Sequence, residues 1–175
     1  MAFYTIEQLK NVLGSGAKTD KFTIAIGTPV GAPDLGLSVD DPILCFSTSF
    51  PGKSSGNVEA WTQGRKLSLP GDTTFDEEWT VTFYQTPGHD LRKKLINWQT
   101  KIDNFRENNH TCTPGDFMVD ANVIQLACNA KESANYVFHN MYPEKISSVN
   151  VASSSINTIE TFDVTFKYSD WEIAL

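Results

Sequence analysis

Hydrophobic and polar residues alternate with a period of two along several segments, most clearly over residues 78–84. Trp79, Val81 and Phe83 fall on one face of this segment, and polar side chains with Tyr84 fall on the other. Such alternation is typical of a β-strand that buries one face. Comparable patterns predict strands over residues 21–27, 43–50, 58–69, 119–128, 135–142 and 159–168. Gly64, inside the segment 58–69, predicts a bulge or bend there.

Two segments have helical periodicity instead. One apolar stripe predicts a helix over residues 87–106, with Thr86 as N-cap and Pro87 as its first residue. The stripe consists of Leu91, Leu95, Trp98, Ile102 and Phe105. Near the N-terminus, Ile6, Leu9 and Leu13 predict a short amphipathic helix. We expect Thr5 to cap it and Gly14 to end it, within a helix-and-linker segment over residues 1–16.

Turn-forming residues separate these elements. Residues 28–41 are rich in proline and glycine, and Pro70-Gly71-Asp72 predicts a turn before the strand at 78–84. Residues 53–57 are small and polar, which predicts a mobile loop. Consecutive strands with tight turns favour a mainly β fold, in which two packed antiparallel sheets form a β-sandwich or barrel flanked by one helix. We expect one domain over residues 1–175, with the sandwich or barrel spanning 17–175.

The composition limits the possible functions. The chain has 175 residues, a net charge of −7 and a pI near 4.9. An acidic protein gains little from the release of phosphate counterions, so tight nucleic-acid binding is disfavoured. Three unclustered cysteines, Cys45, Cys112 and Cys128, do not form a disulfide framework. We therefore expect a reducing compartment, with Cys45 and Cys128 as core residues on strands. The sequence contains neither a membrane-span-length apolar run nor a signal-peptide pattern.

No motif predicts catalysis or metal binding. Gly52-Lys53-Ser54 resembles the end of a phosphate-binding loop, but the glycine required five residues earlier is Ser47. His110 and Cys112 are two residues apart, without the second ligand pair that zinc sites usually have. Asp76, Glu77 and Glu78 are adjacent, so neighbouring carboxylates point to opposite faces of a strand and cannot form a catalytic pair. We therefore expect no enzyme activity, metal or cofactor.

Three segments taken together resemble the tail tube protein family of contractile-tailed bacteriophages. They are residues 66–76 running into 79–82, the helix from His89 to Gln99, and residues 159–172. The residues that carry the resemblance are Gly71, Asp72, Phe75, Trp79, Trp98, Phe162 and Trp171. The sequence departs from the family pattern in a longer acidic step before Trp79 and in a longer loop over residues 27–41.

The resemblance implies a structural role. Members close into hexameric rings whose strands form a continuous inner barrel, and the rings stack into a hollow tube inside a contractile sheath. DNA passes through this tube without specific binding. The implied partners are further copies of the chain, the tail sheath protein, a baseplate tube initiator, the tape measure protein and a tail terminator. The implied location is the virion tail, after assembly in the cytoplasm of the host bacterium.

Candidate residues for these contacts follow from position. Glu59, Glu78 and Asp163 lie opposite the apolar face of their predicted strands, so they are candidates for an acidic lumen surface. The candidates for contacts between subunits or stacked rings are Lys53, Ser54, Ser55, Gly56, Asn57, Trp61 and Tyr142. If residues 53–57 became ordered only on stacking, the entropy cost would be about 1–2 kcal/mol per residue.

Two other functions remain open at this point. The chain could be a baseplate tube initiator or the tube of a phage-tail-like injection system, which would share the fold. It could also be a monomeric ligand-binding β-barrel, which would need a closed apolar pocket with converging polar groups.

Overall fold

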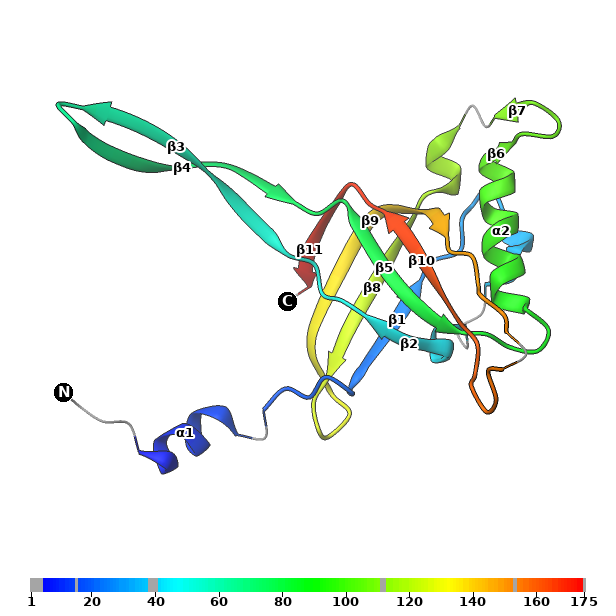
Figure 1. Ribbon diagram of the computed structural model, residues 1–175, viewed down its shortest axis with the longest axis horizontal. Helices are drawn as coiled ribbons and strands as arrows, with labels where there is room; N and C mark the ends of the chain where they lie inside the picture. The colour runs from blue at the N-terminus through cyan, green and yellow to red at the C-terminus, as the bar shows by residue number, and fades with distance from the viewer. Residues whose placement is uncertain (1–4, 15, 38–40, 111–112, 153, 175) are drawn as a thin grey trace.

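The body of the protein is a β-sandwich from which two elements project. The computed structural model describes residues 5–14, 16–37, 41–110, 113–152 and 154–174 (Figure 1). Seven strands, each hydrogen-bonded to its neighbours, form one continuous sheet that folds into two layers. A helix lies at one end of the body, and a long hairpin and the N-terminal helix project on the opposite side (Figure 1).

The two layers share strand β9. The first sheet has the order β1-β8-β9-β11 and the second has the order β9-β10-β5-β2, with every neighbouring pair antiparallel. The strands are β1 (Phe22–Ile26), β2 (Cys45–Thr48), β5 (Glu78–Tyr84), β8 (Val119–Leu126), β9 (Glu132–Ile146), β10 (Thr161–Lys167) and β11 (Asp170–Ala174). The predicted fold of two packed antiparallel sheets is confirmed. The predicted strand at 135–142 is longer in the structure, and β11 was not predicted.

A bend in β9 allows it to enter both sheets. Asn140 has a φ of 54°, which turns the strand where its pairing changes from β8 and β11 to β10. The Asp120 side chain holds the bend, because its Oδ1 atom accepts a hydrogen bond of 3.2 Å from the Asn140 backbone N–H. The backbone N–H of Ser169 donates to the carbonyl of His139 at 3.0 Å. The bend is therefore tied to both β8 and the β10–β11 junction.

The core lies between the two sheets and is aromatic. Alternation along β5 and β10 buries Trp79, Val81 and Phe83 against Phe166 and its neighbours, as predicted. The Trp79 ring stacks on Phe138 with ring centroids 4.7 Å apart. Its Nε1–H donates to Thr48 Oγ1 at 2.8 Å, so the indole satisfies its polar atom while its rings are buried.

Helix α2 (Asp90–Ile102) closes one end of the sandwich. Leu91, Leu95 and Trp98 are buried as the stripe predicted, and Trp98 Nε1–H donates to the carbonyl of Phe117 at 2.9 Å. The predicted limits of 87–106 were too wide. The chain enters the helix through a turn at His89, where φ is 55°, and leaves it at Asp103 in an extended conformation. Phe105 therefore lies outside the helix and is exposed, which corrects its predicted place in the stripe.

Strands β3 (Lys53–Thr62) and β4 (Arg65–Phe75) form the projecting hairpin. The predictions for this region were wrong in three ways. Residues 53–57 belong to β3 rather than to a mobile loop, residues 58–69 are two strands rather than one, and Pro70-Gly71-Asp72 lies inside β4. The chain reverses at Gln63 and Gly64, both with positive φ, as a two-residue hairpin turn requires.

Glycines let the two arms of the hairpin cross closely. A Cβ atom on Gly71 would lie 3.0 Å from the Gly56 carbonyl carbon, and one on Gly56 would lie 3.2 Å from the Asp72 carbonyl oxygen. The ladder is shifted between Ser55 and Asn57, which marks a bulge at this crossing. Gly71 therefore has a packing role within a strand.

Helix α1 (Ile6–Leu13) forms where predicted. Thr5 and Gln8 cap each other reciprocally, and Gly14 follows with φ of 57°. None of the helix residues is buried. The remaining elements are short: β6 (Asp103–Asn104), β7 (Asn109–His110), and the 3-10 turns η1 (Pro33–Leu35), η2 (Asp41–Leu44) and η3 (Pro114–Phe117). Among the described residues, none of the helices has both the length and the apolar character of a membrane span.

The cysteines differ from expectation in part. Cys45 lies on β2 and is half-buried, and burial raises its pKa to about 12. Cys128 is exposed in the turn between β8 and β9, which corrects its predicted place in the core. Cys112 lies outside the described residues.

Candidate functional site

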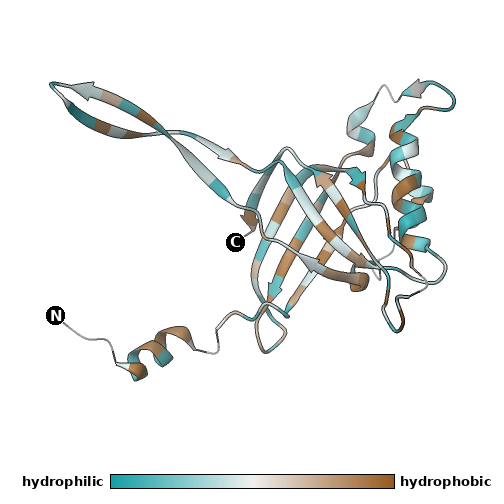
Figure 2. Cartoon of the chain, viewed as in Figure 1, coloured by the Kyte–Doolittle hydropathy of each residue, from teal (hydrophilic) through white to brown (hydrophobic). Residues whose placement is uncertain are grey.

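The hairpin presents one apolar face that none of the described residues covers. Cross-strand pairing places Val58 opposite Leu69 and Ala60 opposite Leu67, so these four side chains share a face. Val58, Leu67 and Leu69 are 45–55% exposed. Figure 2 shows the resulting alternation of hydrophobic and hydrophilic residues along both arms. An isolated two-stranded hairpin is at best marginally stable in water, so such a face requires a partner.

The opposite face of the hairpin carries Trp61 and charged groups. Lys66 forms an ion pair with Glu59 and lies 6.0 Å from the centre of the Trp61 ring. Trp61, a predicted contact residue, is 67% exposed. Glu59, a predicted lumen residue, lies on this projecting hairpin and not on the body. The structure therefore separates Glu59 from the other two lumen candidates.

The predicted stacking segment from Lys53 to Asn57 is structured at the base of the hairpin. Ser54 Oγ lies 2.8 Å from Thr74 Oγ1, and Asn57 Nδ2 donates to Glu59 Oε1 at 3.4 Å. These residues are exposed but already paired with β4.

The outer face of the second sheet is polar. Glu78, Thr80 and Thr82 on β5 face outward together with Asp163 and Thr165 on β10. Thr82 Oγ1–H donates to Asp163 Oδ1 at 2.7 Å, and the hydroxyls of Thr80 and Thr165 lie 3.4 Å apart. Glu78 and Asp163 thus lie on one continuous surface rich in hydroxyl groups.

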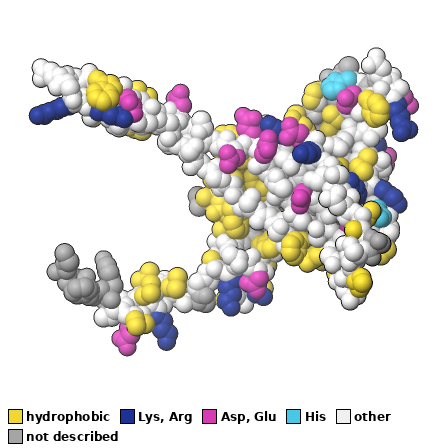
Figure 3. All heavy atoms as spheres, viewed as in Figure 1, with side chains coloured by type: hydrophobic (Ala, Val, Ile, Leu, Met, Phe, Trp, Pro, Cys, Tyr) yellow, Lys and Arg dark blue, Asp and Glu magenta, His cyan; other side chains and the backbone are white. Residues whose placement is uncertain are grey.

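An acidic hollow lies where the hairpin joins the body. It has a volume of about 540 Å³ and is lined by Phe75, Asp76, Glu77, Glu78, Thr80 and Lys167. Lys167 Nζ lies 3.6 Å from Glu78, 3.9 Å from Glu77 and 4.0 Å from Glu144. Figure 3 shows acidic side chains gathered at this junction.

Tyr168 closes the inner side of this junction. Its hydroxyl donates to the Asp76 carbonyl, and its ring stacks on Phe75 with centroids 6.1 Å apart. Burial raises the pKa of Tyr168, and the charges of Asp76 and Glu77 raise it further. The uncharged side chain of Tyr168 therefore holds in place the acidic segment from Asp76 to Glu78 that precedes Trp79.

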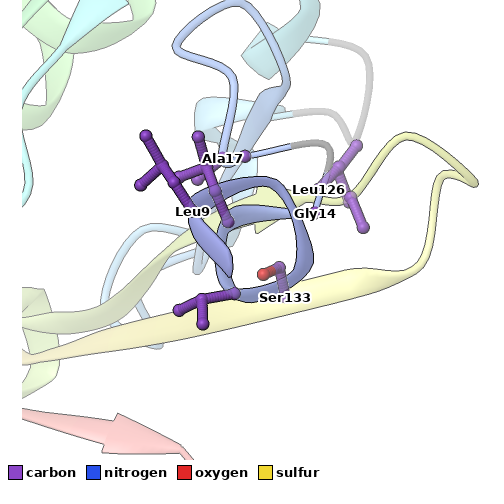
Figure 4. Close-up of a pocket in the computed structure, with 9 residues that line it drawn as sticks. Leu9, Gly14, Ala17, Leu126 and Ser133 are labelled. Atoms are coloured by element: carbon purple, nitrogen blue, oxygen red, sulfur yellow. The ribbon is translucent and has the colours of Figure 1, made fainter. Parts of the chain in front are cut away.

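A second hollow separates α1 from the body. Its volume is about 490 Å³, and Leu9 and Leu13 of α1 line it together with Leu126 and Ser133 (Figure 4). Ile6 and Val12 are 86% and 89% exposed. The apolar face of α1 thus resembles that of the hairpin, in that the described part of the chain leaves it exposed.

A charged cluster around His139 was missed in the sequence. His139 Nδ1 lies 3.2 Å from Asp120 Oδ2, and Nε2 lies 3.6 Å from Glu172 Oε1. Partial burial works to lower the pKa of His139, but the hydrogen bond with Asp120 and the charges of Asp120, Asp170 and Glu172 outweigh it, so the net pKa is raised. Asp120, His139 and Glu172 come from three different strands, and no local pattern in the sequence brings them together.

The other predicted residues have mixed positions. Trp79, Trp98 and Phe162 of the family motif are buried in the core, and Trp171 is partly buried against it. Tyr142 is half-buried on β9, opposite Lys167 of β10, so it offers a neighbour less surface than Trp61 does. The signal that could have revealed the hairpin was the pair Gln63-Gly64 with alternating residues on both sides.

Side chains fill the interior between the two sheets. Among the described residues, no group of three or more His, Cys, Asp or Glu side chains could hold a metal. The space between the sheets is filled by Trp79, Phe83, Phe138 and Phe166, each with at most 1% exposure. A void of about 10 Å³ beside Leu91 and Leu95 holds at most about one water molecule.

Comparisons with known proteins agree with a structural role. Residues 17–174 match the family model described as phage tail tube protein. The chain is 29% identical over 129 residues to the tail tube protein gp19 of Enterobacteria phage T4, covering 73% of this chain and 78% of that protein. It is 30% identical, over the same shares, to tail tube protein gp19 of Enterobacteria phage T6.

Solved structures show the same fold at lower identity. A chain of the sheath–tube complex of the extracellular contractile injection system PVC, in its extended state, superposes with a TM-score of 0.63 at 15% identity. The match covers 98% of this chain and 99% of that chain. A chain of the tube-terminating cap of the anti-feeding prophage also gives a TM-score of 0.63, over 99% of this chain and 94% of that chain, at 15% identity. Because the family model spans both sheets, α2 and the hairpin, the chain belongs to the phage tail tube protein family.

Proposed function

We propose that this tail tube protein closes into rings of six and that the rings stack head to tail into a hollow tube for the passage of DNA. The observation that carries the proposal is the family match over residues 17–174. The uncovered hairpin and α1 support it, because they need partners that an isolated subunit lacks. A head-to-tail contact does not close on itself, so it builds a filament.

The outer face of the second sheet is our proposed lumen surface. Threonine hydroxyls, Glu78 and Asp163 cover this face, and the basic side chain of Lys167 is neutralised by three nearby carboxylates. Lys145 of β9, which pairs with Thr165, adds a second basic side chain to this face. Where carboxylates outnumber basic side chains, a surface repels phosphates and gives DNA little counterion-release gain. Glu59 takes part in the lumen only if the hairpin also lines it.

The proposed contacts between stacked rings use the hairpin. They include Lys53, Ser54, Ser55, Gly56, Asn57 and Trp61 on the hairpin, with Tyr142 as a candidate on the body. The exposed aromatic Trp61 suits an anchor, since aromatic residues often dominate interface energies. Because residues 53–57 are already paired with β4, stacking does not need to order them.

The proposed partners and location follow from the relatives. Contractile systems in the comparisons contain a sheath, a terminator and a baseplate. We propose that the chain binds a tail sheath protein on its outer surface, meets a baseplate initiator and a terminator at the two ends of the tube, and surrounds a tape measure protein. It would assemble in the cytoplasm of the host bacterium, act in the virion tail as one domain over residues 1–175, and carry out no catalysis.

The main competing function is a tube initiator or the tube of an injection system. These proteins share the fold, and the structural matches to injection-system tubes fit this function too. An initiator caps the tube at one end, whereas a tube subunit must offer complementary surfaces at both ends. Unlimited growth therefore distinguishes a tube subunit from an initiator.

Negative-stain electron microscopy of the purified chain tests the proposal. We expect six-fold rings at low concentration, and hollow tubes at high concentration or after baseplates are added. Rings that never elongate under either condition would make the protein an initiator. Monomers under all conditions, including with baseplates present, would contradict self-assembly altogether.

A further inference from the structure

The tip of the hairpin is basic and its base is mainly acidic, although Lys53 lies at the base opposite Phe75. Arg65 and Lys66 follow the turn at its tip, whereas Asp76, Glu77 and Glu78 connect its base to β5. Figure 3 shows basic side chains at the far end of the hairpin and acidic side chains at its junction with the body. Lys66 is paired with Glu59, but within the described residues no ion pair involves Arg65.

The acidic hollow at the base retains excess negative charge. Lys167 is the one basic side chain that lines it among the described residues, and it faces Glu77 and Glu78 with Glu144 beyond, while Asp76 adds a further carboxylate. The Glu77 and Glu78 side chains are 68% and 60% exposed, so they are accessible to a second molecule. The hollow is therefore suited to a basic side chain from outside the subunit.

The length of the hairpin sets the distance between its basic tip and its acidic base. Ten residues of β3 span about 33 Å at about 3.3 Å per residue. A shift of one copy by this distance along the hairpin axis brings its tip to the base of the next copy's hairpin. Every subunit can then supply one tip and receive another, which is the condition for an open head-to-tail polymer.

We propose that the hairpin of each subunit lies along the body of the subunit ahead of it and places Arg65 in the acidic hollow lined by Asp76, Glu77 and Glu78. This inference rests on the stacked tube proposed above and specifies the receiving site. The apolar face of Val58, Ala60, Leu67 and Leu69 is covered in the same contact. The charges fix how far the hairpin advances, since charge complementarity contributes specificity and register.

Charge reversal in the full-length chain tests this pairing. We expect Arg65→Glu to raise the concentration needed for tube formation at least about tenfold, equivalent to about 1.4 kcal/mol, and to leave rings intact. Glu77→Arg should have the same effect from the other side. The double variant with both changes should restore tubes, because the two reversed charges would again attract each other across the contact. Sedimentation with electron microscopy measures tubes, rings and monomers together.

Two matched variants control for net charge. Arg106→Glu and Glu132→Arg reverse exposed charges far from the hairpin in sequence, and both should assemble as the wild type does. Raising the salt concentration should weaken wild-type stacking and narrow the gap to Arg65→Glu, since ions screen exposed pairs.

The outcomes separate this inference from the proposed function. Wild-type-like tubes from Arg65→Glu, or a double variant no better than either single one, would overturn the pairing and leave the tube in place. Loss of rings as well as tubes from a folded Arg65→Glu variant would move Arg65 into the ring contact and also overturn it. If the wild type forms neither rings nor tubes even with baseplates, the proposed function fails and this pairing fails with it.

Discussion

Strand pairs β5–β10 and β3–β4 are built alike and are used differently. Both are antiparallel, and both place apolar side chains at every second position. In β5–β10 that face is buried, with Trp79 and Val81 at most 1% exposed. In β3–β4 every residue of β3 is exposed. The two pairs therefore depend on different sources of stability, although their local sequences read similarly.

Alternation of apolar and polar residues therefore predicts a strand but not what covers its apolar face. The β5–β10 pair is stabilised by Phe138 and Phe166 from within the subunit. The hairpin has only its own ladder and the close crossing of Gly56 and Gly71. An apolar face that the subunit does not cover is the expected mark of a protein completed by assembly.

The largest expected difference in stability is between two tryptophan truncations, one in each strand pair. Trp79→Ala removes a buried ring that stacks on Phe138 and should lower the free energy of unfolding by about 3–5 kcal/mol. Trp61→Ala should change the monomer by less than about 0.5 kcal/mol, because that side chain is exposed. Urea unfolding followed by circular dichroism measures both. Equal losses would mean that Trp61 is buried in the monomer.

A clash at the glycine crossing should affect the hairpin alone. Gly71→Val puts a side chain against the Gly56 backbone, at a local cost of about 1–3 kcal/mol. We expect faster proteolytic cleavage between residues 53 and 75 with an unchanged melting temperature for the body. Gly52→Val is the matched control, since a Cβ there meets nothing within 4 Å. A large fall in the melting temperature of Gly71→Val would mean that the body depends on the hairpin.

A smaller effect is expected at the bend that joins the two sheets. Asp120→Ala removes the acceptor for the Asn140 backbone N–H and a partner of His139. Because Asp120 is largely exposed, the loss should be about 1 kcal/mol. Asp20→Ala, an exposed acid before β1, should be neutral. If the two variants unfold at the same urea concentration, the carboxylate does not stabilise the bend.

The smallest effect is a pH dependence that comes from His139. Its pKa in the folded protein is raised above the ordinary value of 6.5, so its contribution is fully present below about pH 6.5. The contribution is lost as the pH rises through the folded-state pKa. Between about pH 6 and pH 8, the wild type should lose more stability than His139→Gln does. Unfolding curves at both pH values give the slopes, and parallel slopes would rule out a contribution from His139.

Much of the sandwich was predictable because its signals are local. Trp79, Val81 and Phe83 show a burial period that needs no knowledge of partners, and Leu91, Leu95 and Trp98 show one for the helix. Thr5 and Gly14 marked the limits of α1 through capping chemistry. Phe105 failed because an apolar residue at helical spacing continues a stripe only if the helix continues, and here the backbone becomes extended at Asp103.

The order of residue types along the chain was enough to predict the family, the mainly β class and the apolar faces that β5 and β10 bury, since these depend on short-range patterns. Only the tertiary structure decided that residues 53–75 form a free hairpin, and that Asp120, His139 and Glu172 meet at a bend. The tertiary structure also placed Asp76, Glu77 and Glu78 at the base of the hairpin, with Arg65 at its tip. These features depend on which distant strands pair and on how far an element projects, and neither is encoded in the period of a single segment.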